Sequence, residues 1–297
     1  MPGKKSQRNI NSKIEEVRAG LPDPDSDEPL HLNNALLADW LEEFLRDELT
    51  RRRGFQNAVI GLSGGVDSAT AVALCARALG PEHVIALRLP YKTSSSDSLA
   101  HAQLLIDRLG VRSDTIDISA AVDSYLANVP EADGRRRGNV MARVRMIVLF
   151  DQSEKYQALP IGTGNKTERL LGYFTWHGDD APPINPLGDL FKTQVWDLAR
   201  HLKVPQVIVE KHPTADLVVG QTDEADLGIT YAKAERILHY LLKGYSVEQL
   251  ADRGFKMEEL LTVKKRLDAT HWKRALPTMA MLSQTAIGQY YLRPVDY

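Results

Sequence analysis

The sequence predicts an α/β protein with three layers, in which helices cover both faces of a mostly parallel sheet. Short β-branched runs alternate with helical runs between residues 58 and 163, at the spacing of βαβ units. Polar, glycine-bearing segments also follow two of the expected strands, at residues 61–68 and 162–168. Because the carboxyl ends of parallel strands meet at one edge of a sheet, we expect these two segments to lie close together there.

Composition and charge argue against several classes of protein. The 297 residues can bury the core of one large domain or two, and 37 basic against 39 acidic residues leave a net charge of −2. Nothing in this balance points to a nucleic-acid or membrane partner, and no apolar run approaches the length of about 20 residues that spans a bilayer. The single cysteine, Cys75, excludes an internal disulfide and a cysteine-rich metal site. We expect it to pack in the core of a cytoplasmic protein.

The N-terminal part of the chain divides into an arm and a helix. Residues 1–30 are polar and turn-rich, so we expect an arm that is frayed or wrapped on the surface. Residues 32–53 carry apolar side chains at helical spacing, which predicts an amphipathic helix that ends at Gly54. Such a helix either packs against its own sheet or forms a dimer contact. The apolar positions are Leu36, Leu37, Trp40, Leu41, Phe44, Leu45 and Leu49.

The segment at residues 59–68 organises the rest of the chain, because it combines a buried strand, a glycine turn and the start of a helix. Glycines let the backbone approach a ligand closely, and free N–H groups at a helix start favour an anion. The hydroxyl groups of Ser63 and Ser68 add hydrogen-bond donors. Asp67 alone would repel an anion, so its presence indicates Mg²⁺ held between its carboxylate and a phosphate.

Two well-known phosphate loops are absent here. The segment lacks both G-x-x-x-x-G-K-[ST] and the dinucleotide fingerprint G-x-G-x-x-G. An ordinary strand-to-helix turn with incidental glycines is the alternative interpretation. The complete string Ser-Gly-Gly-Val-Asp-Ser at residues 63–68, directly after a strand, favours the phosphate-binding loop.

Strands and helices alternate after this loop. The first helix closes at Gly80, and a second strand is expected at residues 83–89. Capping residues at 94–97 start the next helix, which ends at Gly110 before a third strand at residues 113–118. A sheet built from such units is parallel and covered on both faces.

Residues 134–168 contain several arginines and a second polar, glycine-bearing segment that follows a strand. The run Arg135–Arg137 is typical of a solvated turn. Arg143 and Arg145 point in different directions on a helix, so we expect only one of them to face a site. A further strand at residues 159–163 leads to Glu168, which is either a second metal carboxylate beside the glycine loop or an ordinary surface residue.

The C-terminal part predicts a pocket wall, a loop and a basic tail. Residues 171–193 are aromatic, proline-rich and too irregular for strands, so we expect them to shape a pocket. The long polar connection at residues 212–226 is typical of a disordered loop or of a lid. The tail at residues 270–277 is basic and can reach a phosphate. Helices are expected at residues 195–202, 227–242 and 257–267.

Together these segments resemble one family, the ammonia-dependent NAD synthetases of the N-type ATP pyrophosphatase superfamily. The resemblance covers roughly residues 32–277 and implies a Rossmann-like fold of the adenine nucleotide alpha-hydrolase type. It also implies one synthetase domain at residues 31–297, an ATP pyrophosphatase core with C-terminal helices, after the polar arm at residues 1–30. The matching segments are residues 63–68, 88–91, 138–146, 162–168, 172–175, 213–217, 223–224 and 227–228.

The resemblance implies a carbon–nitrogen ligase that amidates deamido-NAD with ATP and ammonia, the last step of NAD biosynthesis. The nicotinate carboxylate attacks the α-phosphate of ATP, pyrophosphate leaves, and ammonia then displaces AMP from the adenylate. Attack of a carboxylate on a polyanion requires charge neutralisation, which Mg²⁺ and lysine side chains supply. The loop at residues 63–68 would cradle the leaving pyrophosphate.

Matching by motif position assigns roles to individual residues. The catalytic candidates are Asp67, Asp179 and Lys192, and the metal ligands are Asp67 and Glu168. Contacts to ATP and pyrophosphate are expected from Gly61, Leu62, Ser63, Gly64, Gly65, Val66, Ser68, Arg88, Thr163, Lys192 and Thr214. Contacts to deamido-NAD are expected from Asn139, Arg143, Lys166, Asp179, His271 and Lys273.

The resemblance also implies a homodimer and a nitrogen source. Relatives that use glutamine carry an added amidohydrolase domain with a catalytic cysteine, and this chain has neither the length nor a suitably placed cysteine. Free ammonia is therefore expected, unless a separate glutaminase subunit docks. The chain departs from the family in its tail, where Trp272 interrupts the usual His-Lys-Arg, and in a short lid at residues 220–224.

Two other functions remain open. One is a different ATP pyrophosphatase, such as a tRNA-modifying thiolase or a GMP synthetase core; thiolases of this type use cysteines and a basic RNA-binding face, which this composition lacks. The other is a nucleotide-binding sensor without turnover. A sensor would keep the glycine loop but would not need Asp67, Glu168 and Lys192 together, and it would produce no AMP.

Overall fold

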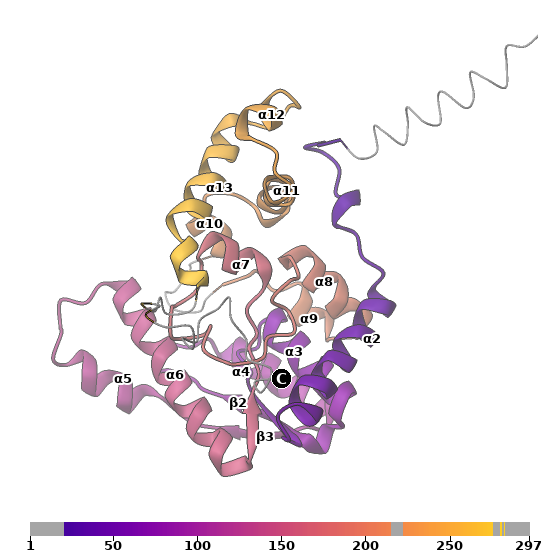
Figure 1. The fold of residues 1–297 in the computed structure, drawn as a ribbon. Coiled ribbons are helices and arrows are strands. Elements are labelled where there is room, and N and C mark those ends of the chain that lie inside the picture. Colours follow the sequence, from indigo (N-terminus) through magenta and orange to yellow (C-terminus); the bar gives the residue numbers. More distant parts are fainter. Residues whose placement is uncertain (1–20, 215–221, 276–279, 281, 283–297) are drawn as a thin grey trace, which may run out of the picture.

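A parallel sheet forms the centre of the computed structural model, which describes residues 21–214, 222–275, 280 and 282. Its strand order within the described residues is β3-β2-β1-β4 (Figure 1). Ala58 of β1 lies opposite Val84 of β2 on one side and Leu159 of β4 on the other. The predicted α/β fold with a parallel sheet is confirmed, although the second, third and fourth strands are shorter than expected. The strands are β1 (Asn57–Gly61), β2 (Val84–Arg88), β3 (Arg112–Thr115) and β4 (Ala158–Pro160).

Helices cover both faces of this sheet, because successive strand residues point to opposite sides. Ala58 and Ile60 are completely buried in the core of one face, and Val59 between them is completely buried in the core of the other. The first face carries α2 (Asn34–Leu45), α3 (Val66–Leu79), α4 (Ser96–Leu109), α8 (Lys192–His201) and α9 (Gln206–Val209). The second face carries α5 (Ser119–Leu126) and α6 (Gly134–Tyr156).

A further group of helices stands above the sheet in Figure 1 and has its own apolar core. The predicted single helix over residues 227–242 is wrong. Gly228 adopts a φ of +73° and ends one helix there, so that the next begins only at Tyr231. The group comprises α7 (Lys166–Leu171), α10 (Asp223–Leu227), α11 (Tyr231–Leu242), α12 (Val247–Ala251) and α13 (Met257–Ala269), followed by the 3₁₀ turn η4 (His271–Arg274).

Residues 21–30 lie against this helical group and against α8. They end in the 3₁₀ turn η1 (Glu28–Leu30), whose Leu30 side chain is buried. Gln194 donates to the Leu30 carbonyl oxygen at 2.7 Å, and Arg236 of α11 pairs with Asp27 at 3.2 Å. The part of the predicted arm at residues 1–20 lies outside the described residues.

The predicted amphipathic helix before β1 is confirmed. It consists of α2 and a π-helical continuation, η2 (Arg46–Arg51), and the chain turns at Gly54 with a φ of +74°. Leu41, Leu45 and Leu49 are buried in the core against the sheet. Leu36 and Trp40 face outward, with 68% and 72% of their surface exposed. The helix therefore packs on its own sheet and also presents an apolar stripe to the outside.

Two further sequence expectations, for Cys75 and for Arg135–Arg137, are settled by the fold. Cys75 is completely buried in the core, as predicted, and burial raises the pKa of its thiol to about 12. The predicted turn at Arg135–Arg137 is wrong: the Asp133 side chain accepts from the Arg136 N–H at 2.7 Å and caps α6, so the arginines form its first turn.

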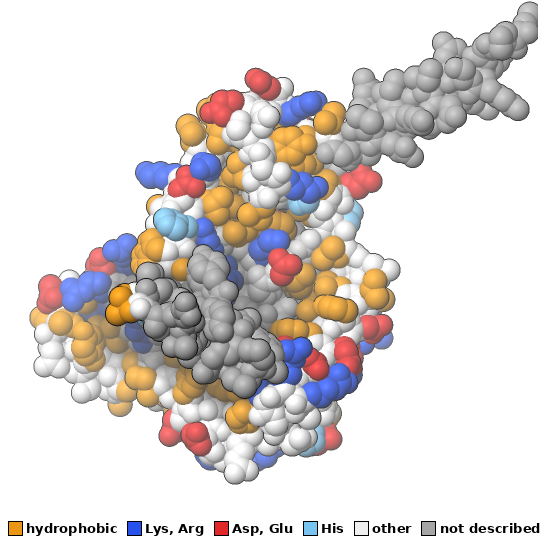
Figure 2. All heavy atoms as spheres, viewed as in Figure 1, with side chains coloured by type: hydrophobic (Ala, Val, Ile, Leu, Met, Phe, Trp, Pro, Cys, Tyr) orange, Lys and Arg blue, Asp and Glu red, His pale blue; other side chains and the backbone are white. Residues whose placement is uncertain are grey.

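No helix among the described residues is long and apolar enough to cross a membrane. Charged side chains of both signs are interspersed over the face in Figure 2.

Candidate active site

The site lies where the sheet order reverses. Strand β1 stands between β2 and β4, so the segments that follow β1 and β4 leave the same edge of the sheet on either side of a crevice. The first of these segments, residues 62–65, leads into α3 and is folded by its own hydroxyl groups. Ser68 Oγ accepts from the Ser63 N–H at 3.2 Å, and Ser63 Oγ accepts from the Gly65 N–H at 3.3 Å. The loop is thus held in shape at the N-terminus of a 14-residue helix, where an anion is favoured.

Gly64 is the tightest position in this loop. Its φ is +80°, and a Cβ atom there would lie 2.1 Å from the carbonyl oxygen of Ser98 in α4. Because the obstructing atom belongs to the backbone of a helix, no side-chain rotation can relieve the contact. Only glycine therefore lets the loop pack against the start of α4.

Replacing Gly64 by alanine is expected to lower kcat/KM for ATP at least about tenfold, because backbone strain and the clash with Ser98 displace the loop. Steady-state kinetics with varied ATP measure the effect. Gly110→Ala is the matched control, since Gly110 has a φ of +68° but nothing within 4 Å of a Cβ position. Equal losses in the two variants would mean that backbone strain, and not the contact with α4, explains the result.

A buried cluster of charges stands beside the loop. Lys192, the first residue of α8, has a side chain that is only 4% exposed. Its Nζ donates to Asp67 and lies 3.7 Å from Glu168 Oε1. Asn165 Nδ2 donates to the other Asp67 oxygen at 3.0 Å, and Glu168 accepts from the Asn165 N–H at 3.2 Å. The three predicted residues Asp67, Glu168 and Lys192 are thus brought together by the first turns of three helices, α3, α7 and α8.

The cluster carries more negative than positive charge. Burial and the neighbouring Asp67 carboxylate raise the pKa of Glu168 to about 8. Burial also raises the pKa of Asp223, which accepts from Tyr231 at 3.0 Å and from Tyr173 at 3.2 Å. Burial opposes the charge of Lys192, but Asp67 and Glu168 outweigh it and raise the pKa of its ammonium group. One lysine therefore faces three carboxyl groups.

This donor set fits a divalent cation. Asp67 and Glu168 both approach Lys192 Nζ, so their oxygens point to a common place, where one ammonium group faces more than one carboxyl group. No group of three or more acidic, histidine or cysteine side chains in the described residues is arranged to hold a metal. Mg²⁺ commonly takes one or two carboxylates and completes its shell with phosphate oxygens and water, which suits two carboxylates beside a phosphate loop.

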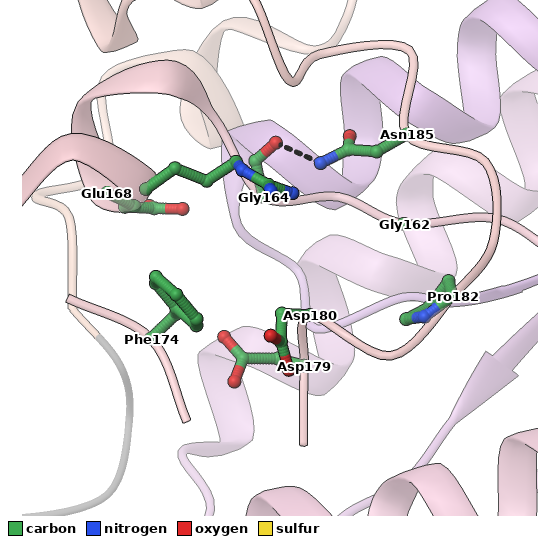
Figure 3. A pocket seen from close by; sticks show the side chains of 9 residues that line it. Gly162, Gly164, Glu168, Phe174, Asp179, Asp180, Pro182 and Asn185 are labelled. Atoms are coloured by element: carbon green, nitrogen blue, oxygen red, sulfur yellow. Dashed lines mark hydrogen bonds between the residues drawn. The ribbon is translucent and has the colours of Figure 1, made fainter. Parts of the chain in front are cut away.

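A pocket opens next to the cluster (Figure 3). It encloses about 350 Å³ of space, part of it open to solvent. The Asp179 and Asp180 side chains lie together on one side of it, across from Glu168. Asp179 keeps contact with solvent, but the protein around it raises its pKa by desolvation. The lining residues are Gly162, Gly164, Glu168, Arg169, Phe174, Asp179, Asp180, Pro182 and Asn185.

Most residues predicted to bind deamido-NAD converge on residues 172–179, which form one wall of this pocket. Asn139 accepts from Thr175 Oγ1 at 2.8 Å, and Asp179 accepts from the Thr175 N–H at 2.8 Å. Arg143 donates to the Trp176 carbonyl oxygen at 3.0 Å. Lys273 donates to the Gly172 carbonyl oxygen at 2.7 Å. Asn139, Arg143, Asp179 and Lys273 are therefore assembled around one loop, and that loop is the irregular pocket wall expected from the sequence.

Two predicted residues lie apart from this wall. Lys166 pairs with the exposed Asp189 at 2.8 Å, and His271 Nδ1 lies 2.7 Å from the Asp268 carbonyl oxygen on the surface of η4. Arg145, as its spacing from Arg143 predicts, points elsewhere and donates to the Leu89 carbonyl oxygen at 3.1 Å.

The remaining predicted contacts to ATP lie at the sheet edge or at the end of a described stretch. Arg88 ends β2 and donates to Gln103 of α4 at 2.5 Å. Thr163 follows β4 directly. Thr214 is the last described residue before the gap at residues 215–221, in which part of the predicted lid falls.

Sequence reasoning did not include several residues that shape the site. Asn165 lies within the motif at residues 162–168, and its link to Asp67 follows from the pairing of β1 with β4. Asn185 donates to the Gly164 carbonyl oxygen at 2.7 Å, and the proline-rich segment around it gave no sign of that partner. Asp223 and Glu235 lie on the buried faces of α10 and α11, where an acidic residue in a helical apolar pattern is the available signal.

Comparisons with known proteins agree with this geometry. A sequence model of the family described as NAD synthase matches residues 37–277. An NH(3)-dependent NAD(+) synthetase from Chlorobium phaeobacteroides is 46% identical over 87% of this chain and 94% of its own length. The solved NMN synthetase from Francisella tularensis superposes with a TM-score of 0.75 at 32% identity, covering 85% of this chain and all of that one.

A second solved structure points the same way. The NH3-dependent NAD synthetase from Campylobacter jejuni has a TM-score of 0.72 at 28% identity and covers 84% of this chain and all of its own. The expected family and its three-layer fold are confirmed by these matches, which span nearly the whole described part of the chain. The chain belongs to the NAD synthase family.

Proposed function

We propose that this protein is an ammonia-dependent NAD synthetase, which amidates the nicotinate carboxylate of deamido-NAD and converts ATP to AMP and pyrophosphate. The observation that supports it most is the buried contact of Lys192 with Asp67 and Glu168 beside a glycine loop at a helix start. A phosphate-binding loop alone would suit a sensor. A buried lysine held between two carboxylates next to that loop suits chemistry in which charge moves among phosphates.

The glycine loop and its neighbours would hold ATP. The loop at residues 61–68 and the hydroxyls of Ser63 and Ser68 would surround the pyrophosphate, with Arg88, Thr163 and Thr214 around the nucleotide. Asp67 and Glu168 would hold Mg²⁺ together with phosphate oxygens. When bound, Mg²⁺ neutralises charge on the phosphates and so permits attack by an anion.

The protein's own residues would orient the two reactants. Lys192 would stabilise the negative charge that develops on the α-phosphate, because its ammonium is buried and fixed beside the loop. Residues 172–179, held by Asn139, Arg143 and Lys273, would form the wall that positions deamido-NAD. Asp179 faces the same pocket and would orient the incoming ammonia or the nicotinate group. Lys166 and His271 would contact the dinucleotide only after their side chains turn inward.

Free ammonia is the nitrogen source that the chain itself can use. Hydrolysis of glutamine by this chain would need a nucleophilic cysteine, and the sequence contains only Cys75. Cys75 is completely buried, and its pKa of about 12 keeps it protonated. A reduced buried thiol also suits a cytoplasmic enzyme.

We further infer that the protein works as a homodimer through the apolar stripe of α2. Leu36 and Trp40 lie four residues apart on α2 and are 68% and 72% exposed, and Leu32, just before the helix, is 44% exposed. Trp40→Glu places a charge in the middle of this stripe and is expected to convert a dimer into monomers, as measured by sedimentation equilibrium. Leu261→Glu, at another exposed leucine on α13, is the control that should stay dimeric. An unchanged dimer in the Trp40 variant would place the interface elsewhere.

One incubation tests the function. Purified protein with deamido-NAD, ATP, Mg²⁺ and ammonium should produce equal amounts of NAD and AMP, and none without ammonium. A parallel reaction replaces deamido-NAD by nicotinate mononucleotide, because a solved relative is an NMN synthetase. Preference for the mononucleotide would reassign the substrate, AMP without amide would indicate another acceptor, and no AMP at all would favour the sensor.

A further inference from the structure

A buried carboxylate on α11 joins the two elements that carry the charge cluster. We propose that Glu235 is a positioning residue, which fixes the backbone of Lys192 and the segment of Glu168 so that Lys192 meets both Asp67 and Glu168. The proposal rests on the function proposed for Lys192. Glu235 does not touch the loop or the pocket, so it would act only through the residues that it holds.

Glu235 has no exposed surface, and both of its oxygens are fully used. Oε1 accepts from Thr167 Oγ1 at 2.6 Å and from the Lys192 N–H at 2.8 Å. Oε2 accepts from Thr193 Oγ1 at 2.5 Å and from the Thr193 N–H at 3.2 Å. One side chain thus connects α7, α8 and α11.

The contact replaces a missing helix cap. The residue before α8 is Phe191, whose side chain has no acceptor for the free N–H groups of the first turn. Glu235 supplies that acceptor from another helix, and its charge lies at the positive end of the α8 dipole. Because Lys192 is the first residue of α8, this cap sets the direction in which its side chain leaves the helix.

The same carboxylate fixes α7. Thr167 Oγ1 donates to Glu235 and accepts from the Lys192 N–H at 3.1 Å, which closes a ring of three residues. Thr167 directly precedes Glu168 in the first turn of α7. The distance between the Glu168 carboxylate and Lys192 Nζ therefore depends on a ring that Glu235 holds together.

The protein retains this group at a cost. Burial raises the pKa of Glu235 to about 7, and no lysine or arginine side chain in the described residues forms an ion pair with it. A buried carboxylate without a cation is unfavourable unless its hydrogen bonds are complete, as they are here. A neutral cap on α8 would stabilise the helix more simply, so the arrangement is better explained by the precise placement of Lys192.

Glu235→Gln tests the proposal with little change in shape. The amide oxygen of glutamine still accepts hydrogen bonds, but its NH₂ group takes the place of the second carboxylate oxygen and faces donors. The hydrogen bonds on that side are lost, so the ring opens. We expect kcat for NAD formation to fall about 10- to 100-fold, because the reacting charges shift by a fraction of an ångström to an ångström. KM for ATP and deamido-NAD should change less than about threefold, since the binding residues remain. Circular dichroism should show a folded protein.

A double variant separates positioning from general structure. If Glu235 acts through Lys192 and Glu168, adding Glu235→Gln to Lys192→Ala should lower kcat much less than Glu235→Gln does in the wild type. If the losses of kcat in the two single variants multiply in the double variant, Glu235 has a separate structural effect and the proposal is overturned. Full turnover in Glu235→Gln would also overturn it. Ser246→Ala removes the cap of α12, away from the site, and should leave kcat unchanged.

Two further results distinguish failure of the positioning role of Glu235 from failure of the function proposed for Lys192. If Glu235→Gln does not fold, Thr193→Val removes one of the four donors while keeping the shape, and it should lower kcat without raising KM. If Lys192→Ala itself turns over normally, the proposed function of Lys192 fails and this inference fails with it. If Lys192→Ala is slow but the Glu235 and Thr193 variants are fast, only the positioning role is wrong.

Discussion

Replacing Lys192 by alanine is expected to lower kcat for NAD formation by about 10²- to 10³-fold, the usual loss when a preorganised charge at a transition state is removed. Affinity for deamido-NAD should stay nearly constant, because the residues that line its wall are untouched. Single-turnover measurements of AMP formation, with substrate binding measured separately, resolve the two quantities. Lys264→Ala removes a lysine that pairs with the exposed Asp268 and serves as the control. A rise in KM with unchanged kcat would refute the role in charge stabilisation.

The Lys192 variant should also show a characteristic dependence of stability on pH. Without the ammonium, three carboxyl groups face one another and the pKa of Glu168, already about 8, rises further. A carboxyl group whose pKa is higher in the folded than in the unfolded state stabilises the fold at low pH, and this contribution is lost as the pH rises through the folded-state pKa. The variant should therefore unfold more easily than wild type at pH 8 and approach it towards pH 5, as followed by thermal denaturation.

Asp67→Asn is expected to reduce pyrophosphate release at least about 10²-fold and to weaken its dependence on Mg²⁺, because a metal ligand and the partner of Lys192 lose their charge together. The fold should persist, since Asp67 lies in the first turn of α3 and the asparagine oxygen still accepts from Asn165. Pyrophosphate release measured across a Mg²⁺ titration checks both statements.

The control for this variant is Asp97→Asn, which changes an exposed aspartate in the first turn of α4. It keeps wild-type turnover if the effect at Asp67 is specific. Near-normal turnover in Asp67→Asn, with an unchanged Mg²⁺ dependence, would remove Asp67 from the metal site.

Local chemistry made much of the site predictable. The glycine string at residues 63–68 and the polar exit at residues 162–168 each follow a strand, and parallel pairing alone brings them to one edge. Asp67, Glu168 and Lys192 were expected at that edge from their motifs, and the structure places them in contact. The closeness of the segments that carry Asp67 and Glu168 needs only the order of strands, whereas Lys192 was assigned from the family resemblance.

Contacts between distant helices were not predictable in the same way. Glu235 stands between Tyr231 and Leu238 in a buried helical pattern, so its burial was readable, but its partners on α7 and α8 were not. The break at Gly228 was missed because the helical spacing on either side continues. For Lys166 and His271, position in a motif predicts a role but not the direction of the side chain, and in the structure both side chains lie away from the pocket wall.

The separation of the site residues along the chain has a consequence for how the protein becomes functional during synthesis. Asp67 meets Asn165 and Lys192 across 98 and 125 residues, and Glu235 reaches back 68 residues to Thr167. Such long-range pairings close late in folding, after local helices have formed. A chain still on the ribosome can therefore complete its glycine loop and remain inactive until α11 has emerged and docked. The protein therefore becomes active only when synthesis of the chain is almost complete. The expected intermediates are shorter chains that bind nucleotide without turning it over.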